Sequence, residues 1–187
     1  MNPILLEVPM RIETERLILR VPLKSGDGMI VNKAIKESFN ELKVWLPFAQ
    51  TLPSVEETEI NLREAHLKFL QRESFRFLIF HKDSHDYIGT TSIQGICWDI
   101  PKCEIGYWIH TKFGGNGYMI EALKGLTNFG LNQFQFKRIE IRCESTNHKS
   151  RAIPEKLGFE LEGILKNEDL SADGRRLTDT CIYALTQ

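Results

Sequence analysis

The hydrophobic pattern predicts strands and helices that alternate along the chain. Segments with apolar residues at every second position, or in short apolar runs, predict strands, and segments with apolar residues three or four apart predict helices. The predicted strands are Leu17–Pro22, Phe75–His81, Tyr87–Trp98, Lys102–His110, Arg138–Glu144, Phe159–Leu170 and Arg176–Leu185. The predicted helices are Gly26–Phe39, Val55–Arg72, Gly117–Asn132 and a short one after Asn147. We therefore expect one mixed α/β domain over residues 1–187.

Local signals add detail to this pattern. Ser54 is placed to cap the second helix, with acidic residues in its first turn. The strands Lys102–His110 and Arg138–Glu144 should be parallel, because a helix crosses between them. Pro154 lies too far into the last helix to be a first-turn proline, so we expect distortion there.

A glycine-rich turn is the most informative feature. The strand ending Glu104–Ile109 leads into Phe113–Tyr118, which holds three glycines in four positions, and a helix begins directly after it. Glycine can take positive φ and lets the backbone approach a ligand closely. A helix start presents free N–H groups and the positive end of the helix dipole. This combination predicts an anion cradle suited to a phosphate or pyrophosphate.

Two familiar phosphate loops fit this turn poorly. A P-loop needs Lys followed by Ser or Thr after its last glycine, but Tyr118 and Met119 stand here. A dinucleotide fingerprint needs a third glycine, but Ile120 occupies that position and the turn lies past mid-chain. A plain strand-to-helix connector stays open as a reading of the turn taken alone.

A second motif follows the strand Arg138–Glu144. Asn147 and Ser150 stand three residues apart at the start of the last helix, and Gly158-Phe159 closes it. By themselves these residues fit a capped helix that ends at a left-handed glycine.

In this order and spacing, the two motifs resemble the acyl-CoA-binding core of the GNAT N-acetyltransferases, and the likeness is greatest to the RimJ/RimL type. Further segments are similar to that family: Thr14–Arg20, Trp45–Pro47, Ile88–Thr91 and Phe159–Gly163. The resemblance implies a mixed, largely antiparallel sheet with a splayed central parallel strand pair and helices on both faces. It also implies direct acetyl transfer from acetyl-CoA to an amine.

The resemblance carries specific roles to this chain. The backbone of Tyr107, Trp108 and Ile109 should pair with the pantetheine of acetyl-CoA. Asn147 should bind or shape the pantetheine site, and Ser150 should protonate the departing thiolate. The cradle that should bind the pyrophosphate consists of Gly114, Gly115, Asn116, Gly117, Tyr118 and Met119.

Two departures from the superfamily pattern narrow the resemblance. Gly114 stands where the loop commonly opens with Gln or Arg, and Met119 stands where it closes with Gly or Ala. Pro154 replaces the Tyr that many members place four residues before the Gly-Phe pair. RimL-like relatives instead use a serine at the position of Ser150, which favours that subgroup.

The general base is left with several candidates. Asp169 lies where RimL-like proteins carry an acidic residue, and Glu168 and Glu104 are alternatives. A chain of water molecules is a further alternative. For the ribose phosphate of acetyl-CoA, the candidates are Lys112, Lys149 and Arg151.

Composition excludes several classes of protein. The 187 residues carry a net charge of −1, with 42% hydrophobic and 26% charged residues, which disfavours a nucleic-acid partner. No apolar run is long enough for a membrane span, and the N-terminus lacks signal-peptide features, so we expect a cytoplasmic protein. The four cysteines show no Cys-x-x-Cys pairing and the histidines no metal spacing, so we expect reduced thiols and no metal.

The acceptor amine stays open at this point. The subgroup includes enzymes that act on ribosomal-protein N-termini and enzymes that act on small amines. The segment Trp45–Phe48 is a candidate wall for the acceptor cleft, or simply a packed corner. A non-catalytic acyl-CoA-binding module and a nicotinamide oxidoreductase are the alternative classes, and the resemblance also allows a homodimer.

Overall fold

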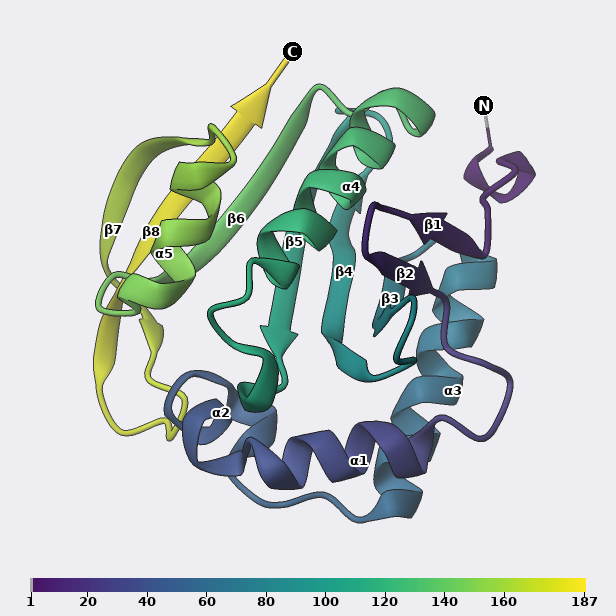
Figure 1. The fold of residues 1–187 in the computed structure, drawn as a ribbon. Coiled ribbons are helices and arrows are strands. Elements are labelled where there is room, and N and C mark those ends of the chain that lie inside the picture. The colour runs from purple at the N-terminus through teal and green to yellow at the C-terminus, as the bar shows by residue number, and fades with distance from the viewer. Residues whose placement is uncertain (1) are drawn as a thin grey trace.

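The computed structural model describes residues 2–187, and Figure 1 shows its ribbon. The strands form one sheet: β1 (Arg11–Glu13), β2 (Leu17–Arg20), β3 (Phe75–His81), β4 (Tyr87–Cys97), β5 (Lys102–Ile109), β6 (Arg138–Glu144), β7 (Glu160–Leu170) and β8 (Leu177–Thr186). The helices are α1 (Gly28–Glu37), α2 (Phe39–Trp45), α3 (Val55–Gln71), α4 (Tyr118–Gln133) and α5 (His148–Lys156). Short 3-10 turns are η1 (Pro3–Leu5), η2 (Pro47–Ala49) and η3 (Thr111–Phe113).

The sheet is mixed and largely antiparallel. Its strand order is β1-β2-β3-β4-β5-β6-β8-β7, and β5 and β6 form the parallel pair. The crossover helix α4 connects these two strands, which is why they must run in the same direction. The predicted fold class and the predicted parallel pair are both confirmed.

Helices cover the two faces of the sheet, and strand alternation assigns residues to each face. In Figure 1, α4 and α5 lie in front of the sheet and α3 lies behind it. On β5, Cys103 and Ile105 join the larger core, which includes buried residues of α4, whereas Trp108 packs against a second core that includes α1. Successive residues of a strand point to opposite faces. We call the α4 side the front face and the α1 and α3 side the back face.

Local chemistry explains the start of α3. The Ser54 Oγ accepts a hydrogen bond from the Glu57 N–H at 3.1 Å, and a Glu57 carboxylate oxygen accepts one from the Ser54 N–H at 2.7 Å. This capping box satisfies two N–H groups that the helix itself cannot, and the serine cap is worth about 1 kcal/mol. The predicted Ser54 cap is confirmed.

The prediction of one helix over Gly26–Phe39 is wrong at its end. The structure has α1 and α2 there, separated at Ser38, which has non-helical φ and ψ of −106° and 7°. Ser38 is buried, and its Oγ accepts a hydrogen bond from the Thr111 N–H at 2.9 Å. This contact joins segments 73 residues apart, so no local pattern announces the break.

Candidate functional site

The glycine-rich turn forms a shallow cradle at the start of α4. Gly115 and Gly117 have φ of +82° and +76°, a region that side-chain-bearing residues rarely adopt. Apart from Gly115 and its two chain neighbours, no atom of the described residues lies within 4 Å of the position that a Gly115 Cβ would take. Gly117 is the N-cap of α4 and supplies no side-chain hydrogen bond to the helix. The start of α4 therefore lacks a side-chain cap, and the binding of an anion by its backbone N–H groups stays a prediction.

Arg16 and Glu121 hold the cradle in place. Glu121, in the first turn of α4, accepts hydrogen bonds from the Arg16 N–H at 2.7 Å and from its guanidinium at 2.6 Å. The guanidinium also donates to the Asn116 carbonyl at 3.2 Å and lies 4.5 Å from the centre of the Tyr118 ring. Partial burial raises the pKa of Glu121, but the hydrogen bonds from Thr14 and Arg16 outweigh it and lower the pKa. No local sequence pattern indicates this support, because Arg16 and Glu121 lie 105 residues apart.

Met119 closes the cradle without reaching the ligand side. Its side chain is buried in the front core, so only its backbone is available at the helix start. The Asn116 side chain donates to the carbonyls of Phe113 and Gly114 at 3.1 and 3.3 Å. Both side chains thus shape the turn, so the predicted anion binding would use the backbone of the cradle.

The parallel strands separate just before the cradle. Their register covers Lys102–Glu104 against Arg138–Glu140 and ends there. Beyond Glu104, β5 continues to Ile109 with β4 alone as its partner, and β6 continues with β8 alone. Within the described chain, the facing edges of the two strands are therefore open along Tyr107–Ile109. The predicted splay is confirmed, and its open backbone groups can pair with an extended amide chain.

Ser150 meets Tyr107 on the front side of this gap. The Ser150 Oγ lies 3.1 Å from the Tyr107 phenol oxygen, and the phenol donates to the Ser150 carbonyl at 3.0 Å. Asn147 caps α5 and accepts a hydrogen bond from the Ser150 N–H at 3.1 Å. The structure thus brings together the predicted residues Asn147 and Ser150 with a phenol that the sequence analysis assigned only a backbone role.

Pro154 explains why this phenol has a partner. In an α-helix the N–H of residue 154 would donate to the carbonyl of residue 150, but proline has no N–H. The helix continues through Pro154 to Lys156, and the Ser150 carbonyl accepts from Tyr107 instead. Burial raises the pKa of Tyr107, and its hydrogen bond with Ser150 opposes this only in part. The phenol therefore stays protonated at neutral pH.

Glu104 lies on the back side of the same gap. It is the last β5 residue in the parallel register, and its carboxylate accepts a hydrogen bond from the Gln94 amide at 3.2 Å. Burial raises the pKa of Glu104, and Gln94 and Arg142 lower it by less. Residues 104 and 107 point to opposite faces, so Glu104 and Tyr107 flank the gap from its two sides.

The other predicted carboxylates lie farther along the sheet. Glu168 accepts a hydrogen bond from the Arg142 guanidinium at 2.5 Å, and hydrogen bonds from Thr180 and Arg142 lower the pKa of Glu168. Asp169 lies exposed on the edge strand β7, where its carboxylate accepts from the Leu170 N–H at 2.7 Å. In the strand order, β8 stands between β7 and β6. The role of Asp169 as general base stays a prediction.

The comparison with known families decides the identity. A family model described as the acetyltransferase (GNAT) domain matches residues 16–160. The chain belongs to the GNAT acetyltransferase family. Its relatives carry N-acetyltransferase names, so this GNAT protein is an enzyme that transfers acetyl groups.

Relatives and solved structures place this GNAT chain among similar enzymes. It is 31% identical to the uncharacterized N-acetyltransferase p20 of Bacillus licheniformis, over 62% of this chain and 64% of that protein. It is 28% identical to the ribosomal protein uS5-alanine N-acetyltransferase of Escherichia coli, over 94% of this chain and 90% of that protein. A solved structure of RimL, the ribosomal L7/L12 alpha-N-protein acetyltransferase, in complex with coenzyme A has the same fold, with a TM-score of 0.87, 24% identity and coverage of 94% and 97%.

Aromatic residues border the back side of the GNAT gap. The Phe48 ring lies 6.4 Å from the Trp108 ring, measured between centroids, and Phe48 is half exposed. This contact places η2, within the segment predicted as an acceptor wall, beside the strand that lines the gap. The contact also serves packing, so the role of the segment in acceptor binding stays a prediction.

Two predicted phosphate ligands of the GNAT enzyme differ in their surroundings. The Arg151 guanidinium donates to the Tyr183 hydroxyl and the Ser145 carbonyl, both at 3.0 Å, so it serves the packing of α5. The Lys112 ammonium lies 5.2 Å from the centre of the Phe113 ring, at the entrance of the cradle. The assignment of the ribose-phosphate contact to Lys112, Lys149 or Arg151 stays a prediction.

Three further properties of the described residues concern metal ligands, membrane-spanning helices and cysteines. Residues 2–187 contain no group of three or more His, Cys, Asp or Glu side chains arranged to hold a metal ion. None of the helices in this part of the chain is long and apolar enough to cross a membrane. The four cysteines carry free thiols. Burial raises the pKa of Cys143, the cysteine nearest Ser150 in sequence, to about 11.

Proposed function

We propose that this enzyme transfers the acetyl group of acetyl-CoA directly to the free amine of a protein N-terminus, of the kind that a ribosomal protein presents. The observation that carries the proposal is the open strand gap, which leads into the α4 cradle. Ser150 stands on one side of this gap and Glu104 on the other. The uS5-alanine N-acetyltransferase relative supports the choice of a protein N-terminus.

Residues on the two faces of the sheet carry out different steps of the reaction. The backbone of Tyr107–Ile109 pairs with the pantetheine amides, and the cradle binds the pyrophosphate. Acetyl-CoA supplies an acetyl group activated as a thioester. From the back face, Glu104 removes a proton from the acceptor amine as its nitrogen attacks the acetyl carbon. A β5 backbone N–H in the gap stabilises the oxyanion.

Collapse of the tetrahedral species completes the transfer on the front face. The carbon–sulfur bond breaks, and its electron pair goes to sulfur. Ser150 gives its hydroxyl proton to this thiolate and regains a proton from solvent. The Tyr107 phenol, 3.1 Å from the serine oxygen, turns its hydrogen bond from the Ser150 carbonyl to that oxygen as charge develops there. Tyr107 is thus a positioning residue for Ser150.

A thermal scan and a transfer screen test the proposed function. Acetyl-CoA at about 100 times its dissociation constant should add about 2.7 kcal/mol to the free energy of unfolding, and NADH should add none. Labelled acetyl should then appear on N-terminal peptides. A shift without transfer to any amine would make the protein a binding module. Transfer to small amines alone would exclude a protein acceptor.

Valine substitutions in the cradle test the pyrophosphate site. Gly115→Val and Gly117→Val force a β-branched residue into positive φ, which moves the backbone N–H groups away from the ligand. We expect acetyl-CoA affinity to fall at least 10-fold, measured by calorimetry. Gly174→Val is the matched control, because Gly174 has φ of +69° in the distant turn between β7 and β8. Equal loss of affinity in the control variant would mean that general strain, rather than the cradle, weakens binding.

A further inference from the structure

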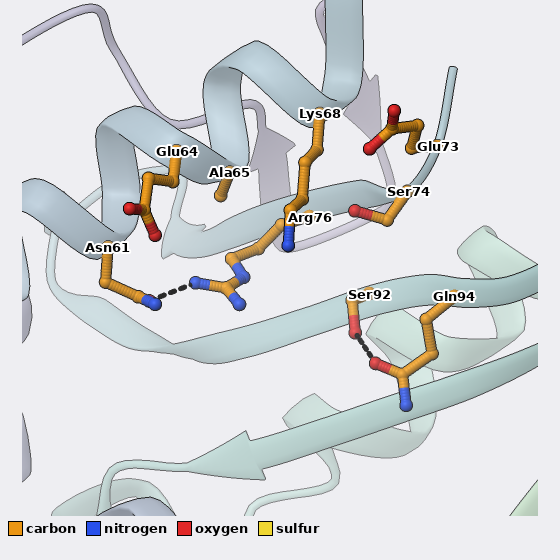
Figure 2. Close-up of a pocket in the computed structure, with 9 residues that line it drawn as sticks. All are labelled: Asn61, Glu64, Ala65, Lys68, Glu73, Ser74, Arg76, Ser92 and Gln94. Atoms are coloured by element: carbon orange, nitrogen blue, oxygen red, sulfur yellow. Dashed lines mark hydrogen bonds between the residues drawn. The ribbon is translucent and has the colours of Figure 1, made fainter. Parts of the chain in front are cut away.

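A polar pocket lies on the back face between α3 and the strands β3 and β4. Figure 2 shows Asn61 and Lys68 reaching into it from α3, Arg76 from β3, and Ser92 and Gln94 from β4. Its volume is about 280 Å³. Pockets for drug-sized ligands begin at roughly 300 Å³ and are mostly apolar. A small polar group therefore fits this pocket better than a large apolar ligand.

Arg76 is the unusual residue of the pocket. Its guanidinium makes one hydrogen bond, to the Asn61 side-chain oxygen at 2.5 Å, and no carboxylate of the described residues lies within salt-bridge distance. Burial lowers the pKa of Arg76, and the charge of the more distant Glu64 does not restore it. A half-buried guanidinium with most of its five donors unused is costly unless an anion or water pairs with it.

The other arginines show how unusual this is. Arg72 donates to the carbonyls of Leu6 and Phe69. Each remaining arginine lies within 4.0 Å of a carboxylate: Arg11, Arg16, Arg20, Arg63, Arg138, Arg142, Arg151, Arg175 and Arg176. The chain thus pairs its arginines internally, and Arg76 alone among the described arginines keeps its fork open toward a cavity.

Other charges border the same cavity. Lys68 points into it from α3 and forms no ion pair within the described chain. The carboxylates of Glu64 and Glu73 also line it, and neither lies within 4.0 Å of a cationic group of residues 2–187. Two cations and two carboxylates thus leave the lining without net charge. The open guanidinium fork, rather than an overall positive field, gives the pocket its selectivity for an anion.

A cross-strand row connects Arg76 to the strand gap. Arg76 is the register partner of Ser92, and Ser92 is the register partner of Gly106. Strands lie about 4.8 Å apart, so Arg76 lies roughly 10 Å from Gly106 along this row. Gly106 stands two residues past the end of the parallel register, at the mouth of the gap.

The side chains of Ser92 and Gln94 lie along this row beside Gly106. A Cβ on Gly106 would point to the back face, where it would meet the Ser92 Oγ at 3.4 Å and the Gln94 amide at 3.5 Å. Any larger side chain there would stand between the gap and the pocket. The proposed base, Glu104, lies on the same face two residues before Gly106. An acceptor that runs from Glu104 over Gly106 to Arg76 therefore passes along the Ser92 and Gln94 side chains and can contact their polar groups.

We propose that Arg76 binds an acidic group of the acceptor, a carboxylate or a phosphate, about 10 Å from the amine that receives the acetyl group. This inference rests on the proposed function, because it takes Glu104 and the gap as the place of the amine. The planar guanidinium donates two parallel hydrogen bonds to a carboxylate or phosphate. The preferred acceptors are then N-terminal peptides with an early acidic side chain, or small amines of matching length.

Matched acceptor pairs test this preference. The first pair is a hexapeptide with glutamate or glutamine as its third residue, and the second is 8-aminooctanoate or its amide. Wild-type enzyme should show a kcat/KM about 10- to 100-fold higher for the acidic member of at least one pair. The pair that shows the preference identifies the acceptor as a peptide or a small amine. Arg76→Gln should remove the preference, and Arg76→Lys should keep part of it.

Controls separate recognition from folding and from the proposed function. Arg175→Gln removes an exposed arginine from a distant turn and should keep the full preference. Equal rates for both members with wild-type enzyme, or equal loss for both in Arg76→Gln, would refute the inference. If no amine is acetylated, the proposed function fails. Calorimetry with glutarate and inorganic phosphate then tests by itself whether the pocket at Arg76 binds an anion. Binding to wild type but not to Arg76→Gln supports it, and no binding to wild type at millimolar concentration refutes it.

Discussion

Ser150→Ala is expected to lower kcat for acetyl transfer by about 100-fold or more and to leave acetyl-CoA affinity nearly unchanged. The hydroxyl gives a proton only when the carbon–sulfur bond breaks, so its loss affects the transition state and not the bound ground state. Stopped-flow or steady-state kinetics with the best acceptor, together with calorimetry, measure both quantities. A normal kcat in this variant would return Ser150 to a structural role at the start of α5.

Tyr107→Phe tests whether the phenol acts through the serine. It keeps the ring in the core and removes the hydroxyl that lies 3.1 Å from the Ser150 Oγ. We expect kcat to fall about 10-fold in the single variant and no further loss when the change is added to Ser150→Ala. Such non-additivity is the signature of two groups that act as one unit. Independent, multiplying effects would contradict the positioning role.

Glu104→Gln is expected to lower kcat/KM at neutral pH by 100- to 1000-fold. The amide keeps the shape of the carboxylate but accepts no proton, and the loss should ease at high pH, where the amine arrives neutral. The wild-type rate should rise as pH increases through the raised pKa of Glu104. The variant should lack the rise in that pH range and gain rate only at the higher pH at which the amine loses its proton. Asp169→Asn is the comparison. If the pH profile is altered in that variant alone, the general base is Asp169 on β7 and not Glu104.

The same substitution should stabilise the fold. A carboxyl whose pKa is raised on folding holds its proton more tightly in the folded state, so stability falls as pH rises from the unfolded pKa through the folded one. Burial has the largest effect on the pKa of Glu104. The hydrogen bond from Gln94 and the charge of Arg142 lower this pKa, and the charges of Glu140 and Glu168 raise it. Glu104→Gln should therefore match wild type below that range and have a higher Tm at pH 8. A lower Tm at pH 8 would contradict the buried-charge argument.

The sequence predicts those features that local chemistry decides. The Ser54 cap, the positive-φ glycines of the cradle and the parallel strand pair each follow from neighbouring residues or from the order of elements. The gap follows from the family resemblance and is confirmed by the short register. Each of these rests on contacts close in sequence or on a topological rule.

The features missed by the sequence depend on distant pairs. Arg16 and Glu121 are 105 residues apart, and Tyr107 and Ser150 are 43 apart. The Ser38 break in the first helix depends on Thr111, 73 residues away. A single sequence carries no periodic signal for such contacts, because any arginine or tyrosine on a half-buried strand is compatible with many partners. The structure is needed to choose among them.

The short parallel register has a mechanical consequence. In the described part of the chain, the register between β5 and β6 covers only three residue pairs, Lys102–Glu104 with Arg138–Glu140, and the Pro101 carbonyl adds backbone hydrogen bonds at its end. Strands β1–β5 on one side of this short register and strands β6–β8 on the other form two parts of the sheet that can bend relative to each other. A ligand that hydrogen-bonds to the backbone of both strands in the gap joins the two parts of the sheet. The enzyme is then more rigid while the substrate is bound and more flexible after the product leaves.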